Sequence, residues 1–189
     1  MVKIILGYLS LREKYNFLFI GIASPFLLAV FLEDDIMTSL ELKVPPAVQV
    51  VMVAAAMYGV SKSLPVLGFT LTGSLLLASA FVVLGLGLGV IGVIAFKKAQ
   101  TTVNPHTPQN ASHLVTSGIY HYTRNPMYLG LVCMLLGWAL YLSHVLAFIG
   151  IVIFMGYLSR FQIVPEERVM LQKFGDVYRD YKIKVRRWL

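Results

Sequence analysis

Long apolar stretches alternate with shorter polar ones along this chain. The apolar stretches cover residues 15–32, 45–61, 69–96, 127–142 and 145–164. Residues 69–96 exceed the roughly 20 residues that an α-helix needs to cross a lipid bilayer, and the other four stretches are at or just below this length. Only Ser143 and His144 separate the last two stretches, so these are expected to form a helical hairpin. The pattern predicts an all-α integral membrane protein with about five transmembrane helices.

The end of the chain has a different pattern. Over residues 166–185 and just beyond, large apolar residues recur at steps of three and four, and basic residues occupy the other face. The apolar positions are Phe174, Val177, Tyr178, Tyr181, Val185 and Trp188, and the basic ones are Lys173, Arg179, Lys182 and Arg186. This spacing predicts a basic amphipathic helix in the cytoplasmic headgroup layer of the membrane.

These elements divide the chain into two parts. Residues 1–44 form an N-terminal segment with a first transmembrane helix, and residues 45–189 form the core. The core contains the one long polar stretch, residues 97–126, which lies between two apolar runs. Polar loops of this length are usually functional or disordered, so we expect the chemistry of the protein to lie here.

Composition supports a membrane protein. The chain is 58% hydrophobic and only 13% charged, with a mean hydropathy of +0.75. Soluble domains are roughly 45–50% apolar and about 25% charged, so the apolar excess must face lipid. This composition excludes a disordered chain. Cys133 is the only cysteine, which excludes a disulfide scaffold and a thiolate metal cluster.

The distribution of charge predicts the orientation of the core. The formal net charge is +7, and seven of the sixteen Lys and Arg residues follow residue 164. Lys97, Lys98 and Arg124 lie in or beside the polar loop. Because cytoplasmic loops carry an excess of Lys and Arg, both the loop and the C-terminus are expected in the cytoplasm. A basic excess with this origin does not call for a nucleic acid partner, and the orientation of residues 1–44 stays open.

Two motifs have simpler explanations than ligand binding. Residues 87–92 match a dinucleotide-binding fingerprint, but they lie inside an apolar run, where Gly85 and Gly89 are spaced for close helix packing. His106, His113 and His121 lack neighbouring carboxylates and the spacing of metal ligands. We therefore expect neither a nucleotide loop at these glycines nor a metal site.

The residues before the hairpin form a candidate anion site. Asn125 is a favourable N-cap and Pro126 a favourable first helical residue, so a helix is expected to begin here with free N–H groups. Arg124 adds a full positive charge beside them. This combination suits a carboxylate or a phosphate. Alternatively, Arg124 only follows the excess of basic residues on the cytoplasmic side.

A candidate site of opposite charge follows the last apolar stretch. Glu166 and Glu167 come directly after Pro165, where the chain is expected to leave the membrane. Acidic residues in the first turn of a helix are favourable for structural reasons alone. Two carboxylates beside the bilayer would also hold an ammonium group or ribose hydroxyls. A zwitterionic ligand with an amino-acid moiety would fit both ends of such a pocket.

Several separated motifs resemble one family. They are residues 114–120 (LVTSGIY), residues 124–128 (RNPMY), the pair Glu166 and Glu167, Phe174 with Gly175, Tyr178 and Tyr181. In this order and between these apolar stretches, they are similar to the membrane methyltransferases that include isoprenylcysteine carboxyl methyltransferase and the phospholipid methyltransferases. The resemblance covers roughly residues 70–189.

This resemblance implies S-adenosylmethionine as the methyl donor, a lipophilic acceptor that enters from the bilayer, and a prokaryotic cytoplasmic membrane as the location. The residues that it places around the cofactor are Ser112, His113, Leu114, Val115, Gly118, Tyr120, Asn125, Pro126, Met127, Tyr128, Glu166 and Glu167. Arg124 would orient the cofactor carboxylate or an anionic acceptor, and Glu166 would hold the cofactor's amino group or ribose. Arg160 and Gln162 are the candidates for contacts with the acceptor.

Two departures from the family pattern leave the acceptor open. Asn125 stands where many members have histidine before the proline. Gln162 stands where the prenylcysteine enzymes have an arginine for the substrate carboxylate, although Arg160 is nearby. A lipophilic thiol, a lipid amine and a prenylated acid therefore all remain candidates. An amine or a thiol must lose a proton before it accepts a methyl group, and the sequence offers no obvious base.

Two other functions remain as alternatives. Membrane sterol reductases share a related hairpin and loop and use a nicotinamide cofactor, but this chain is short for their larger pocket. A non-catalytic membrane scaffold would need only a polar loop that docks a partner. Apart from Lys62 and Arg160 near their ends, the apolar stretches from residue 45 on contain no charged residue that would mark a transport path. The sequence does not indicate the oligomeric state.

Overall fold

The computed structural model describes residues 41–100 and 112–189 of the chain. All secondary-structure elements assigned in these residues are helices. These residues belong to one unit, Glu41–Leu189. The predicted all-α fold is thus confirmed for this part of the chain. The predicted first span and the middle of the polar loop lie outside the described residues.

The first two described helices differ in how well their starts were predicted. Helix α3 (Pro46–Ser63) begins as expected at a proline in its first turn. Helix α4 (Ser74–Lys98) begins five residues later than the expected start at residue 69. Residues 65–67 form a short 3₁₀ helix, and the Phe69 N–H donates to the Ser143 carbonyl in the hairpin turn. Gly73, with a φ of +78°, then directs the chain into α4.

The predicted hairpin is confirmed. Helix α5 (Pro126–Leu142) and helix α6 (Val145–Leu158) are joined by Ser143 and His144, and Ser143 has a φ of +48°. The buried His144 ring nitrogen Nε2 lies 2.9 Å from the Leu64 carbonyl oxygen. This contact joins the hairpin turn to the connection between α3 and α4.

The last apolar stretch and the C-terminal amphipathic helix, expected as separate elements, form one continuous helix. Helix α6 continues through a π-helical segment, Ser159–Ile163, into helix α7 (Val164–Lys184). The helix accommodates Pro165 because its backbone widens there to a π turn. The bend occurs instead at Gly175, whose φ of +54° is outside the helical region. The amphipathic segment is thus two helical pieces.

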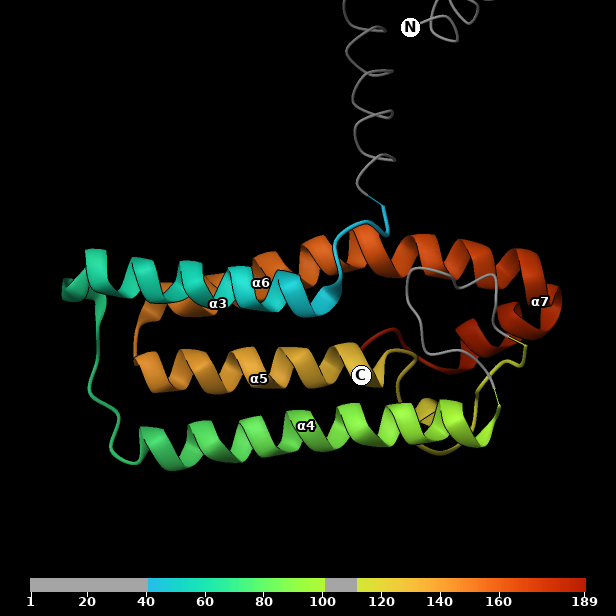
Figure 1. Cartoon of the computed structure of the whole chain (residues 1–189), viewed down its shortest axis with the longest axis horizontal. Coiled ribbons are helices and arrows are strands. Elements are labelled where there is room, and N and C mark those ends of the chain that lie inside the picture. Colours follow the sequence, from blue (N-terminus) through green and yellow to red (C-terminus); the bar gives the residue numbers. More distant parts are fainter. Residues whose placement is uncertain (1–40, 101–111) are drawn as a thin grey trace, which may run out of the picture. The chain divides into compact units, whose positions relative to one another are not determined.

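Glycines set the packing of α4 against α5, which lie side by side and antiparallel in Figure 1. A Cβ atom on Gly85 would lie 2.4 Å from the Gly130 carbonyl oxygen, and one on Gly137 would lie 2.7 Å from the Ala78 carbonyl oxygen. Such backbone contact between helices is typical of membrane proteins. The glycine-rich run therefore packs helices, as its sequence context predicts.

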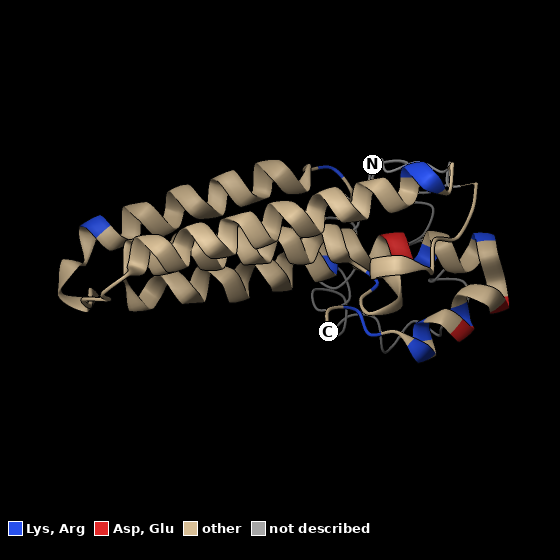
Figure 2. Cartoon of the chain, turned by 90° about the horizontal axis from the view of Figure 1, so that it is seen from below, with Lys and Arg blue, Asp and Glu red and all other residues tan. Residues whose placement is uncertain are grey.

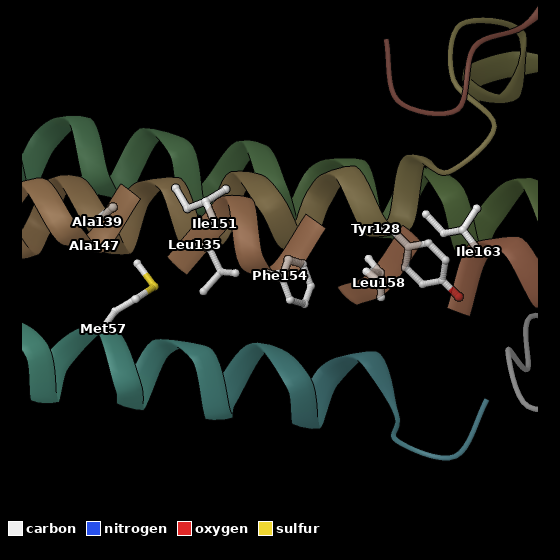
Figure 3. Close-up of a cluster of buried hydrophobic side chains, with 9 residues drawn as sticks. All are labelled: Met57, Tyr128, Leu135, Ala139, Ala147, Ile151, Phe154, Leu158 and Ile163. Carbon is white, nitrogen blue, oxygen red and sulfur yellow. The ribbon is translucent and has the colours of Figure 1, made fainter. Parts of the chain in front are cut away.

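Helices α3 and α6 complete the core. Helix α3 packs against α6 and α5. The buried side chains between them are drawn in Figure 3: Met57, Tyr128, Leu135, Ala139, Ala147, Ile151, Phe154, Leu158 and Ile163. Large apolar residues also cover the outer faces, where Leu76 is 76% exposed and Val152 is 69% exposed. So much exposed apolar surface is suited to lipid.

Two described helices are long and apolar enough to cross a membrane, Ser74–Lys98 and the continuous helix Val145–Lys184. The second has 40 residues, about twice the length that a span requires. Its charged residues begin at Arg160 and are concentrated in α7. We therefore take α7 to lie beyond the spanning part. Figure 2 shows most charged residues gathered around α7 and the end of the bundle that adjoins it.

Candidate active site

Hydrogen bonds and an ion pair bring three segments together at this charged end: residues 112–125, the first turn of α5, and the helix from the π segment into α7. Gly118, with a φ of +63°, begins a 3₁₀ turn that ends at His121. Pro126 is the first residue of α5 and Asn125 is at the N-cap position, as expected, but the Asn125 side chain makes no capping hydrogen bond. Its Nδ2 instead donates to the Arg187 carbonyl oxygen at 3.0 Å.

Glu166 is held by two uncharged donors. The Tyr128 hydroxyl donates to its Oε1 at 2.5 Å, and the Gln162 amide donates to the same atom at 2.6 Å. The Oε2 atom receives no hydrogen bond from any residue that the structure describes. Burial raises the pKa of Glu166 to about 7, although both hydrogen bonds favour the ionised form. Glu166 is therefore only partly ionised at neutral pH.

Tyr120 adds a second polar group with spare bonding capacity. Its side chain is buried, and its hydroxyl has no hydrogen-bond partner among the described residues. The Tyr181 hydroxyl donates to its carbonyl oxygen at 2.6 Å, which fixes the backbone. Burial raises the pKa of Tyr120, with smaller contributions from Tyr181 and Glu166. The hydroxyl thus stays protonated and can donate to a ligand.

Glu167 has the opposite surroundings. Its carboxylate lies 2.9 Å from Arg124 Nη1 and 3.1 Å from Lys182 Nζ, and Arg187 binds both of its oxygens at 3.0 and 3.1 Å. Burial raises the pKa of Glu167, but hydrogen bonds from Arg187 and Lys182 and the charge of Arg124 outweigh it and hold the pKa below its usual value. We call these four residues the Glu167 cluster.

The Glu167 cluster attaches the C-terminal tail to the loop before α5. The Arg124 N–H donates to the Arg186 carbonyl, and Thr123 Oγ1 and Asn125 Nδ2 donate to the Arg187 carbonyl. The Arg124 side chain is only 10% exposed, and its Nε has no hydrogen-bond partner among the described residues. Three cationic groups around one carboxylate leave a net positive charge that could attract an anionic ligand group.

The remaining predicted residues do not all face one pocket. Ser112 and His113 are exposed, and His113 Nδ1 lies 3.2 Å from the Ser112 hydroxyl. Leu114 packs against Tyr178 and Tyr181. The other placements are as follows: Val115 is buried, Gly118 shapes the 3₁₀ turn, Met127 contacts α4 at Gly92, and Arg160 pairs with Glu41.

Sequence reasoning separated an anion end from a cation end, but the structure distributes the two glutamates differently. Glu167 belongs with Arg124, so only Glu166 has an oxygen available to donors of a ligand. The contributions of Lys182, Arg187 and Glu41 were missed, because nothing in the spacing of these residues links them to positions so distant in the sequence. The described residues contain no group of three or more His, Cys, Asp or Glu side chains that could hold a metal ion.

Comparisons with known proteins bear on what this arrangement does. The model of the family described as phospholipid methyltransferase matches residues 74–177, more than half of the chain. The Glu167 cluster, apart from Lys182 and Arg187, and the residues that bind Glu166 lie inside this match. No solved structure matches the chain.

Two similar proteins add detail. An uncharacterized protein from Haemophilus influenzae is 52% identical over 63 residues, which are 33% of this chain and the whole of that protein. A protein-S-isoprenylcysteine O-methyltransferase from Schizosaccharomyces pombe is 34% identical over 123 residues, 63% of this chain. The matched part covers 45% of that enzyme, so the chain spans less than half of its length.

Proposed function

The chain belongs to the phospholipid methyltransferase family, and from this premise we propose that it transfers a methyl group from S-adenosylmethionine to a lipophilic acceptor at the cytoplasmic membrane surface. The observation that carries the proposal is the surroundings of Glu166. A partly buried carboxyl group lies there between uncharged side chains, with one oxygen that no described residue uses. An oxygen left open in this way suits a ligand with hydrogen-bond donors.

The residues present suit the chemistry of the cofactor. When bound, S-adenosylmethionine supplies a methyl group that is already activated by its sulfonium sulfur. Its ammonium group or ribose hydroxyls would bind the free oxygen of Glu166, and the buried Tyr120 hydroxyl is a further donor. The net positive charge of the Glu167 cluster would attract its carboxylate through Arg124. Of the loop residues that the family resemblance implies, the exposed Ser112 and His113 would be open to the cofactor, whereas Leu114 and Val115 would support the loop from within the protein.

The residues act mainly by binding and positioning. A transfer to a nucleophile needs the two reacting groups in line and shielded from water, which a site between packed helices provides. Tyr128 and Gln162 are buried, so their hydrogen bonds hold the Glu166 carboxyl group in a fixed position. The lipophilic acceptor would reach this end of the bundle directly from the bilayer, along the exposed apolar faces of the helices.

The distribution of charged residues supports a site on the cytoplasmic side of the membrane. The end of the bundle that carries the site also carries Lys97, Lys98 and the basic residues of α7, whereas the other end carries Lys62 (Figure 2). Membrane proteins keep the more basic end in the cytoplasm. The family match favours neither a nicotinamide-dependent reductase nor a scaffold.

Calorimetric titration with S-adenosylhomocysteine, the product of the cofactor, tests the proposal on the detergent-solubilised chain. We expect micromolar binding by the wild type and at least a tenfold loss in Glu166→Gln. Asp180→Asn is the matched control, because Asp180 is an exposed acid of α7. No binding by folded wild-type protein would overturn the proposal.

Methylation with radiolabelled S-adenosylmethionine then identifies the acceptor class. Phosphatidylethanolamine, a prenylcysteine and a lipophilic thiol represent the three candidates. An amine or thiol acceptor has to lose a proton, and a carboxyl group with a pKa near 7 is suited to receive it. A Glu166→Gln variant that still binds the product but no longer methylates an amine would place Glu166 at the acceptor rather than at the cofactor.

A further inference from the structure

The π segment next to the site has an unusual partner. Pro165 has no N–H, so it cannot donate to the Phe161 carbonyl, which lies four residues before it in the helix. The Leu42 N–H donates to this carbonyl at 3.0 Å. A main-chain hydrogen bond from the segment before α3 thus satisfies an acceptor that the proline leaves exposed in the helix.

A carboxylate beside Leu42 strengthens this contact. Glu41 Oε1 lies 2.8 Å from Arg160 Nη1 and 2.6 Å from Arg168 Nη2. Only 12% of the Glu41 side chain is exposed. Although burial raises it, hydrogen bonds from both arginines hold the pKa of Glu41 below its ordinary value, so the group is ionised at neutral pH. One carboxylate therefore joins two positions eight residues apart on the helix.

The two arginines flank the residues that define the site. Arg160 lies in the π segment and Arg168 lies one turn into α7, with Gln162 and Glu166 between them. The Gln162 amide donates to Glu166, so any change in the register of the π segment would move this donor. Because a π turn shifts the register of a helix, contacts from outside the helix at this point can influence the position of Gln162.

The backbone of Leu42 indicates that this contact is held against strain. Its φ is +59°, in the left-handed region that residues with a side chain rarely adopt. Such a conformation is unfavourable and persists where surrounding contacts enforce it. Here the hydrogen bond to Phe161 and the neighbouring Glu41 ion pairs are contacts of this kind.

We propose that Glu41 and Leu42 form a clamp on the π segment Ser159–Ile163, and that the clamp keeps Gln162 in place against Glu166. Glu41 is then a positioning residue, which acts on the site through Arg160, Arg168 and the helix register. The segment before α3 thereby becomes part of the catalytic unit. The clamp rests on contacts within the chain, and only its effect on cofactor affinity rests on the proposed function.

Hydrogen exchange of the full chain in lipid nanodiscs tests the clamp without a ligand. Glu41→Gln keeps the shape of the side chain but removes its charge. We expect at least fivefold faster amide exchange in the peptide that covers residues 158–168. Glu41→Asp should restore most of the protection. Asp176→Asn is the matched control, because it also removes one carboxylate from an Arg pair, that with Arg179, but on the exposed surface of α7.

A second measurement separates positioning from general loosening. Loss of the Gln162 contact would remove a hydrogen bond that favours ionised Glu166, so the pKa of Glu166 should rise in Glu41→Gln. The midpoint can be followed by ¹³C NMR of labelled glutamate carboxyl groups in the ligand-free protein. Affinity for S-adenosylhomocysteine should also fall about tenfold.

The outcomes are distinguishable. Unchanged exchange and an unchanged Glu166 midpoint in Glu41→Gln would overturn the clamp, whatever the wild type binds. A wild type that does not bind S-adenosylhomocysteine would overturn the proposed function, while the exchange data still decide on the clamp. If Glu41→Gln does not fold, Arg168→Gln removes one of the two ion pairs and should give a smaller increase in exchange in the same peptide.

Discussion

Glu166 and Glu167 are adjacent in the sequence, yet their surroundings are opposite. Two uncharged donors, Tyr128 and Gln162, share one oxygen of Glu166, whereas Arg124, Lys182 and Arg187 surround both oxygens of Glu167. Burial accordingly raises the pKa of Glu166 to about 7, while the cations hold that of Glu167 below its usual value. Neighbouring positions on a helix point about 100° apart, which is enough to place them in different environments.

This difference separates a structural carboxylate from a candidate functional one. Glu167 is fully engaged within the protein and attaches the C-terminal tail to the loop before α5. Glu166 is held on one oxygen only, by two uncharged donors, and desolvation raises its pKa. A carboxyl group in such surroundings gains most from a ligand that brings donors or a positive charge.

The largest expected effect is on stability, in Glu167→Gln. This substitution leaves Arg124, 10% exposed, without a counter-charge, and removal of one partner from a buried ion pair is strongly destabilising. We expect a loss of about 2–4 kcal/mol in the free energy of unfolding, below the value for fully buried pairs because the side chains of Lys182 and Arg187 are 36% and 32% exposed.

Thermal unfolding in detergent at pH 7.5, roughly half a unit above the pKa of Glu166, measures this loss. Glu166→Gln is the comparison variant, and there the protein should be as stable as the wild type or more stable, because an uncompensated charge is removed. Equal destabilisation by the two substitutions would contradict the distinction between the two glutamates.

The next effect is on the pH dependence of stability. A carboxyl group whose pKa is higher in the folded state binds more protons when folded, so its stabilising contribution is present below about pH 4.5 and is lost as pH rises through about 7. Between these values the wild type should lose up to about 3 kcal/mol relative to Glu166→Gln. The measurement is a pair of unfolding series from pH 5 to pH 8, and parallel curves for the two proteins would refute the assignment.

Most of the helices could be predicted from hydropathy, but the contacts that give Glu166 and Glu167 different surroundings could not. Apolar runs and the prolines at residues 45, 46 and 126 locate α3, α5 and α6, because these signals are local. The start of α4 and the continuity of α6 with α7 depend on a turn at Gly73 and on a π segment, for which the sequence has no reliable signal.

The candidate site was predictable in part. The motif residues Arg124, Tyr128 and Glu166 do converge with Tyr120 at one end of the bundle. Which glutamate pairs with which charge depends on the direction that each side chain takes from the helix and on where the tail docks. Arg187 binds Glu167 from a tail whose main chain is held by Arg124 and Asn125, and the spacing of these residues gives no sign of such docking.

A smaller effect should follow from Tyr128→Phe. This substitution removes one of the two donors to Glu166 Oε1 and leaves an aromatic ring of nearly the same shape. Because the lost hydrogen bond favoured the ionised form, the pKa of Glu166 should rise further, and the midpoint of the pH series should move upward. Tyr122→Phe is the control, since Tyr122 is 71% exposed. The same midpoint in both variants would show that Tyr128 does not hold Glu166.

The smallest effect should come from Lys182→Ala. Lys182 contacts one oxygen of Glu167 at 3.1 Å and its side chain is 36% exposed, whereas Arg187 binds both oxygens in a fixed geometry. A partly exposed ammonium group contributes at most about 1 kcal/mol, and a bidentate guanidinium contributes more. Arg187→Ala should therefore destabilise the protein more than Lys182→Ala, and only the first should also loosen the tail in hydrogen exchange. A larger destabilisation by Lys182→Ala than by Arg187→Ala would contradict this prediction. The stability of the cluster would then not depend on the geometry by which Arg187 binds Glu167.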